Sequence, residues 1–290
     1  MMKPHKIIFT LIFCFCALSF FAQDEEKEQD KPVRPPFQSG YLIDNQTTYI
    51  PYKNTLEYVI QHKFGTMANG ISDLYGLYAP GANVRLGFNY VILNNVEVGY
   101  GLSKSNMTHD FNAKWTIFEQ TRKNTFPVAL TLYGVAAING QADDYFGKDY
   151  SFMGRFSYFS QLIVSRKFND WLSIQAGGSF SHYNMVDRTK SDFDKVGVHF
   201  NGRAKFSPQS SFIFNYDQPL GLLVLRNKNG NNTSPNIAVG VEIATSTHAF
   251  QIYAGQFGGV LPQDIMVNNY NEFDVSSFRI GFTITRLWSF

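Results

Sequence analysis

Apolar and polar residues alternate along most of this chain after residue 54. Residues 84–90 read Val-Arg-Leu-Gly-Phe-Asn-Tyr, residues 96–102 read Val-Glu-Val-Gly-Tyr-Gly-Leu, and residues 278–285 repeat the pattern. Successive side chains of a β-strand point to opposite faces of the sheet, so each segment would have one apolar face and one polar or glycine face. The pattern predicts twelve strands, near residues 54–65, 83–92, 96–105, 108–118, 126–138, 153–167, 171–184, 194–206, 210–217, 236–246, 248–256 and 275–290.

The connections between these predicted strands alternate between long and short. The long ones lie near 66–82, 139–152, 185–193, 218–235 and 257–274, with a weak member at 105–108, and the short ones near 93–95, 122–124, 169–170, 207–209 and 246–247. Outer-membrane barrels have short periplasmic turns and long external loops, whereas a Greek-key sandwich gives no reason for this alternation. We therefore predict an all-β fold, a transmembrane antiparallel up-and-down β-barrel of about 12 strands over residues 54–290. The even count would place both termini in the periplasm.

The composition fits a wall of this kind. Hydrophobic residues make up 44% of the chain and the mean hydropathy is −0.18, which alone would suit a soluble protein, but aromatic residues reach 16% and charged residues only 17%. Apolar and polar residues alternate in barrel strands, so the mean hydropathy of such a chain does not show its membrane location. Barrels also carry aromatic belts at both membrane interfaces. Tyr90, Trp115, Trp171 and Trp288 lie near predicted strand ends, where such belts would be.

The first 53 residues are predicted to precede the barrel. Basic residues at 3, 5 and 6 come before an apolar stretch over 7–21, which is typical of a secretory signal peptide at residues 1–23 and less so of an uncleaved anchor. Residues 24–36 are charged and rich in proline, so residues 24–53 are interpreted as a flexible periplasmic leader. Within it, residues 37–53 alternatively form a short plug or a lead-in to the first strand. Cys14 and Cys16 both fall in the signal peptide, which leaves a mature chain without disulfides.

The chain ends with an aromatic residue, Phe290, on an amphipathic last strand. This ending is typical of the signal read by the outer-membrane barrel assembly machinery, which is therefore a predicted partner. The second predicted partner is outer-membrane lipid, which would surround the apolar face of the barrel. Arg286 lies on that otherwise apolar face and weakens the match.

Several short segments in this order resemble a known family, the membrane-bound β-barrels of Bacteroidota catalogued as a domain of unknown function. The segments are residues 61–65, 73–77, 85–88, 165–168, 171–175, 181–184 and 281–286. The family usually ends with Phe soon after the arginine, whereas this chain continues to Phe290. The resemblance implies a fold and a membrane location, but no activity.

If the apolar face meets lipid, the polar face lines a lumen. The candidate lining residues are Glu57, Lys63, Arg85, Glu97, Lys114, Arg155, Gln175, His199, Asn201, Arg203, Lys205, Glu242 and Arg279. With Lys167 and Asp217 added, eight basic residues stand against four acids. Two interpretations remain open: a paired network that fills and braces the lumen, since buried charges persist only when paired, or a narrow pore in which the excess cations attract anions. Twelve strands fall between filled eight-stranded barrels and sixteen-stranded channels.

Other chemistry has weaker support in the sequence. Ser181, His182 and Asn184 suggest a wall-borne lipase, but Ser181 would point to the opposite face from His182. The remaining histidines are scattered, and the loop acids Asp143, Asp144, Asp149, Asp192 and Asp194 are the only candidates for a surface Ca²⁺. No metal, cofactor or nucleic-acid site is predicted.

The sequence thus predicts a non-enzymatic outer-membrane barrel that is a narrow pore for a small solute. The alternative is a sealed structural barrel whose long loops 139–152, 218–235 and 257–274 bind an external ligand or partner. A third possibility is an accessory subunit of a periplasmic system.

Overall fold

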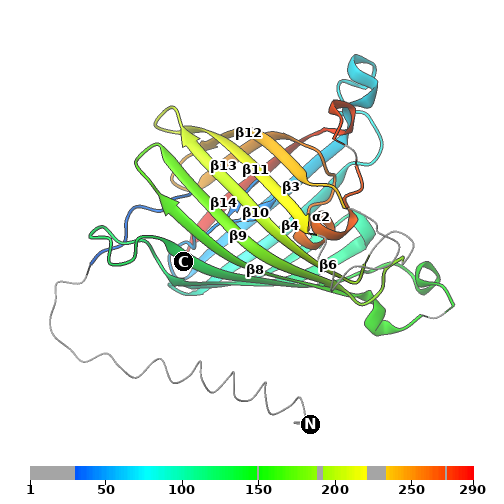
Figure 1. The fold of residues 1–290 in the computed structure, drawn as a ribbon, viewed down its shortest axis with the longest axis horizontal. Helices are drawn as coiled ribbons and strands as arrows, with labels where there is room; N and C mark the ends of the chain where they lie inside the picture. Colours follow the sequence, from blue (N-terminus) through cyan, green and yellow to red (C-terminus); the bar gives the residue numbers. More distant parts are fainter. Residues whose placement is uncertain (1–29, 149, 188–191, 221–232, 272) are drawn as a thin grey trace, which may run out of the picture. The chain divides into compact units, whose positions relative to one another are not determined.

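The fold is a closed barrel of antiparallel strands (Figure 1). The computed structural model describes residues 30–290 apart from 149, 188–191, 221–232 and 272. Within these residues, the twelve strands of the wall are β3 (Thr55–Thr66), β4 (Asn83–Leu93), β5 (Val96–Ser103), β6 (Thr108–Phe118), β7 (Ala129–Ile138), β8 (Phe156–Lys167), β9 (Leu172–Tyr183), β10 (Asp194–Lys205), β11 (Ser210–Leu220), β12 (Asn236–Ala244), β13 (His248–Gly255) and β14 (Arg279–Ser289). All twelve predicted strands are confirmed. The predicted signal peptide lies outside the described residues.

Strand β14 pairs with β3 and closes the barrel, with Thr55 opposite Ser289. Because the two strands are antiparallel, the first strand begins where the last one ends. We call this the termini end of the barrel and the opposite one the loop end. The longest connections meet at the loop end, as the alternation of lengths predicts. They carry the short helices η2 (Met67–Asp73), η3 (Ser105–Met107), η4 (Asp143–Phe146), η5 (Phe152–Arg155), α2 (Pro262–Asn268) and η6 (Val275–Ser277). That the termini end faces the periplasm stays a prediction.

The outer face of the wall is apolar and the inner face is polar. On β4, the side chains of Leu86, Phe88 and Tyr90 point outward and are 38–46% exposed, whereas Arg85 and Asn89 point inward and are 2% and 0% exposed. An apolar surface of this extent is costly in water and needs lipid around it. In the described part of the chain, no helix has the length and apolar character needed to cross a membrane.

The predicted aromatic belt lies at the termini end. Tyr90 and Trp115 lie close to the ends of β4 and β6, Trp171 precedes β9, and Trp288 is near the end of β14. The guanidinium of Arg286 lies 4.8 Å from the ring centroid of Trp288. This explains the arginine on the apolar face, because a long side chain at an interface can keep its charge in water.

A short hairpin from the N-terminal segment fills the lumen from the termini end. It pairs β1 (Tyr41–Leu42) with β2 (Asn45–Gln46), and Ile43 and Asp44 form its tip. Every residue from 39 to 48 is buried. Ile43 has a φ of 56°, a conformation that is unfavourable for a β-branched residue. The hairpin therefore has a strained tip that the surrounding wall holds in place.

Helix α2 fills the lumen from the loop end (Figure 1). Its residues Ile265, Met266 and Val267 are no more than 2% exposed and pack on an apolar part of the inner wall that includes Tyr133 and Phe159. Pro262 is the first residue of the helix, where its missing N–H costs nothing. The inner wall is thus apolar beside β7 and β8, and a second apolar part on β11, β12 and β13 packs on Leu42 and Ile43 of the hairpin. The rest of the inner wall is mostly polar.

Two sequence predictions need correction here. The flexible leader predicted over residues 24–53 is wrong for its second half, because residues 37–48 are the inserted hairpin and its approach; the alternative of a short plug is what the structure has. The long connection over 257–274 was predicted to be an external loop, but residues 260–267 lie almost entirely inside the barrel. Their apolar residues find a matching apolar wall only after the barrel has closed.

Candidate functional site: a lumen filled from both ends

The structure places most of the predicted lining residues inside the barrel. Those with 6% exposure or less are Glu57, Lys63, Arg85, Glu97, Lys114, Gln175, His199, Asn201, Arg203 and Glu242. Three others lie at the rims and only partly buried: Lys205 at the termini end, Arg155 and Arg279 at the loop end. Arg155 binds the loop residues Asn139, Gln141 and Asp143, so it braces a loop and lines a cavity at the loop end.

The charged residues of the wall mostly pair with one another. Arg85 donates two hydrogen bonds to Asp110, at 2.8 and 2.6 Å. The other wall pairs are Lys114–Glu97 at 3.2 Å, Arg203–Glu242 at 2.7 Å and His199–Asp217 at 2.7 Å. Such pairing offsets the cost of removing each charge from water.

The Arg85–Asp110 pair spans a strand, since the two residues come from β4 and β6. Gly101 of β5 lies between them, and a Cβ on that residue would overlap both side chains. A side chain at this position would therefore displace the pair from this geometry. Asp110 was not among the predicted lining residues. It lies four residues before Lys114 on the same strand, so the alternation of side chains places both on the inner face, and this signal could have identified it.

The predicted excess of positive charge in the lumen is wrong. Among the described residues, the buried cations are Lys63, Arg85, Lys114, Lys195 and Arg203, and the buried acids are Asp44, Glu57, Glu97, Asp110, Asp217 and Glu242. The sequence prediction left out two buried acids, Asp44 and Asp110, and four of its eight predicted cations lie at the rims. The interior is therefore close to electrically balanced, and the premise for anion preference inside the lumen is lost.

The hairpin is bonded to the wall around most of its circumference. The Gly40 N–H donates to Glu57 of β3, the Ile43 N–H to Gln251 of β13 at 2.7 Å, and the Gln46 carbonyl accepts from Gln175 of β9 at 2.7 Å. Asn45 donates to Asn215 and Asp217 of β11, and the hydroxyls of Thr48 and Ser165 are 2.5 Å apart. These bonds satisfy backbone and side-chain groups that would otherwise be buried without partners.

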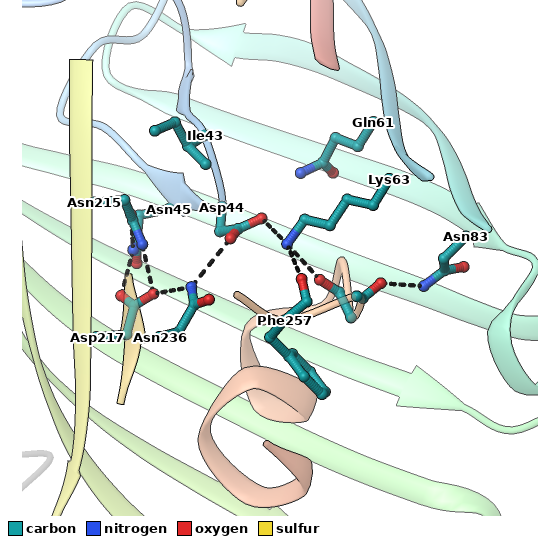
Figure 2. Close-up of polar contacts among 12 residues, drawn as sticks. Ile43, Asp44, Asn45, Gln61, Lys63, Asn83, Asn215, Asp217, Asn236 and Phe257 are labelled. Carbon is teal, nitrogen blue, oxygen red and sulfur yellow. Dashed lines mark hydrogen bonds and ion pairs between the residues drawn. The ribbon is translucent and has the colours of Figure 1, made fainter. Parts of the chain in front are cut away.

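Lys63 joins the hairpin to the loop insert (Figure 2). Its Nζ atom lies 2.7 Å from Asp44 Oδ1 at the hairpin tip, and both side chains are at most 1% exposed. The same atom donates to the carbonyl oxygens of Phe257 at 2.9 Å and Gly259 at 2.8 Å. Figure 2 shows Asp44 between Lys63 and Asn236, which donates to its other carboxylate oxygen at 3.1 Å. One wall lysine therefore contacts both segments that fill the lumen.

Large cavities lie at the two mouths of the barrel, and the cavity at the hairpin tip between them is small. The termini end has a cavity of about 550 Å³ and the loop end has cavities of about 440 and 610 Å³. Between the hairpin tip and residues 260–262 the space is about 10 Å³, which is room for one water molecule at most. Among the described residues, the space at the hairpin tip is thus too small for a solute.

The residues proposed for a lipase do not assemble into a catalytic group. His182 bonds to Asp194 at 2.6 Å and to Asn184 at 2.9 Å, while the Ser181 side chain is 0% exposed on the inner face. Asp194 and Asp143, two of the candidate calcium ligands, pair instead with His182 and Arg155. Asp149 lies outside the described residues.

A closed antiparallel wall with an apolar outer face and a polar, balanced interior defines a β-barrel protein of the bacterial outer membrane. The chain belongs to the family described as "Membrane bound beta barrel domain (DUF5777)", which matches residues 37–288. The match begins at the hairpin, so the insert is part of the family's domain.

The fold is also similar to solved structures. An outer-membrane channel from Pseudomonas putida F1 has a TM-score of 0.51 at 13% identity, covering 83% of this chain and 97% of that one. The NanC porin has a TM-score of 0.48 at 8% identity and the KdgM porin 0.44 at 10% identity; each comparison covers 81% of this chain and 99% of the porin. At these identities the similarity concerns the fold. No curated protein matches the sequence.

Proposed function

We propose that the protein is a non-enzymatic, gated pore for small polar solutes, and that the conformation described above is its closed state. The observation that carries the proposal is the division of contacts in the lumen. Three ion pairs and the His199–Asp217 hydrogen bond lie entirely within the wall. The hairpin is held by hydrogen bonds, by apolar packing of Leu42 and Ile43 on the wall, and by a single ion pair, Lys63–Asp44. Departure of the hairpin would therefore leave most wall charges paired.

The hairpin itself favours this interpretation. Residues in sparsely populated backbone regions cost about 1–3 kcal/mol and are found where a conformation is held by its surroundings. Ile43 is such a residue, and it is 0% exposed at the tip. Leaving the lumen would relieve this strain and hydrate the polar wall, which offsets part of the hydrogen bonding that is lost.

The width of the barrel also supports a pore. Barrels of eight strands are filled by their own side chains. Here twelve strands enclose a two-stranded hairpin and a helix in addition to the wall side chains. Once both inserts leave, the vacated cross-section would be water-filled, and its balanced charge predicts weak selectivity between anions and cations.

The proposal is tested by removing the inserts and measuring current. Three variants replace residues 37–48, residues 259–269, or both, with Gly-Ser linkers, and heat-modifiable gel migration checks that each barrel is folded. In planar bilayers the full chain should be mostly silent and the double variant should conduct steadily. A folded double variant without current would contradict the pore and support the alternative, a sealed barrel whose external loops bind a partner.

The same proposal includes orientation and assembly. An exposed terminal Phe290, 82% accessible, suits recognition by the barrel assembly machinery from the periplasm. The termini end would then face the periplasm and the loop end the exterior. Protease cleavage of intact cells within loop 139–155, and not at the turn over 206–209, is the expected result.

A further inference from the structure

The cavity at the termini end is lined mostly by positive charge. Its volume is about 550 Å³. Its charged lining residues are Arg34, Lys167, Arg203 and Lys205, against one acid, Asp170. The remaining lining residues include Phe37 and other members of the segment that leads into the hairpin. None of these charges takes part in closing the middle of the lumen, so the pore proposal leaves them unexplained.

Two of the four cations have no acidic partner. Arg203 is paired with Glu242 inside the wall at 2.7 Å. Lys167 lies 3.1 Å from Asp170, but the Asp170 side chain is 99% exposed, and an ion pair so open to water contributes little. Lys205 and Arg34 form no ion pair with any residue that the structure describes. The cavity therefore keeps an excess of positive charge.

The effect of this charge is visible on the one acid present. The hydrogen bond from Lys167 lowers the pKa of Asp170, and the charges of Arg34 and Lys205 lower it further. All three cations thus act on a carboxylate at the rim of the cavity. A second carboxylate or phosphate group placed inside the cavity would meet the same field from closer range.

We propose that this cavity is a binding site for a small anion that carries two or more carboxylate or phosphate groups. Charge-assisted hydrogen bonds from lysine and arginine are the usual means of holding such groups. A recessed mouth lined by one sign of charge also concentrates anions from solution. Ser173 and Arg203, which line the cavity, belong to the inner face of the wall and are buried, so the site faces the lumen and not the lipid. We therefore assign it to a free solute and not to a lipid headgroup.

The site is tested by calorimetry on the full chain in phosphatidylcholine nanodiscs, with citrate and inorganic phosphate as probes. Lys205→Gln should weaken citrate binding by about tenfold or more, because a hydrogen bond to a charged group is lost. Asp170→Asn should strengthen it, because the only acid is neutralised. Lys53→Gln removes an exposed lysine at the same end but outside the cavity, and should bind citrate as the natural chain does.

Three results would overturn the assignment. The first is absence of citrate binding by the folded natural chain. The second is an equal loss in Lys53→Gln and Lys205→Gln, which would mean diffuse surface charge. The third is loss of citrate binding when phosphatidylglycerol replaces phosphatidylcholine, which would mean that lipid headgroups occupy the site. Calorimetry does not depend on current through the barrel, so a failure here is distinct from a failure of the pore proposal.

Discussion

Replacement of Lys63 by methionine should open the proposed pore without removing any segment. The ammonium group forms the ion pair with Asp44 at 2.7 Å and donates to the carbonyls of Phe257 and Gly259. All three contacts go to the inserts. Lys63→Met keeps a long apolar side chain on the wall and removes only the charge and its donors.

The size of the effect follows from the burial of these groups. Removing one partner of a buried ion pair costs about 3–5 kcal/mol, and a carbonyl left buried without a donor adds about 1–3 kcal/mol. The cost falls on the closed conformation alone, because Asp44 and the loop carbonyls are hydrated once the inserts leave. Taking only the lower figure of about 3 kcal/mol, the ratio of open to closed molecules should rise about 100-fold, since about 1.4 kcal/mol is a factor of ten.

The assay is the open probability of single barrels in planar bilayers, together with hydrogen exchange of residues 37–48. Lys195→Met is the matched control, because it removes another buried lysine that has no bond to either insert in the described residues. Adding Asp44→Asn to Lys63→Met should restore part of the closed population, since the unpaired carboxylate is then gone. An unchanged open probability and unchanged exchange in Lys63→Met would refute the role of this lysine.

Three further predictions concern the hairpin, the loop helix and assembly. In a Thr48→Cys, Ser165→Cys variant, a disulfide should hold the hairpin in the lumen when oxidised and release it when reduced, because the native hydroxyls are 2.5 Å apart. A current that is the same with and without reductant would contradict a mobile hairpin. Burial raises the pKa of Asp264 above 3.8 although Tyr183 and Asn268 donate hydrogen bonds to it, so the seating of α2 should be strongest below that pH and weaken as pH rises through the raised value. Hydrogen exchange of 262–268, corrected for its intrinsic pH dependence, measures this, and Asp264→Asn should abolish the trend. Phe290→Ser should lower the yield of heat-modifiable barrel in outer-membrane fractions with little effect on the stability of assembled protein, because the side chain is 82% exposed; a normal yield would contradict its role in assembly.

The wall was predictable because its signals are local. A period of two fixes which residues face lipid, and the lengths of the connections fix the order of strands around the barrel. On β4 the alternation alone separates outward Phe88 from inward Arg85. Where the period fails, the prediction fails with it. Arg155 was placed in the lumen because the predicted strand over 153–167 began three residues before β8, whereas Arg279 is the first residue of β14 and lies at the rim.

The inserts could not be predicted because their partners are far away in the sequence. Asn45 is polar and precedes a run of polar residues, which by itself suggests a solvated segment. Its hydrogen-bond partners Asn215 and Asp217 are 170 and 172 residues away, so its burial depends on closure of the whole barrel. Likewise, Met266 and its neighbours are apolar without any visible period. Only the apolar inner faces of β7 and β8 explain where they go.

The two inserts differ in how much of the lumen each one closes. This difference predicts which deletion variant conducts the larger current. The hairpin and its flanks bond to β3, β9, β11 and β13, on opposite sides of the barrel. Helix α2 packs on one side, against the inner face of β7 to β11. A one-sided insert narrows a lumen, whereas an insert bonded all round obstructs it. Removal of residues 37–48 alone should therefore give most of the current of the double variant, and removal of residues 259–269 alone very little. The reverse order would mean that the helix, and not the hairpin, is the main barrier.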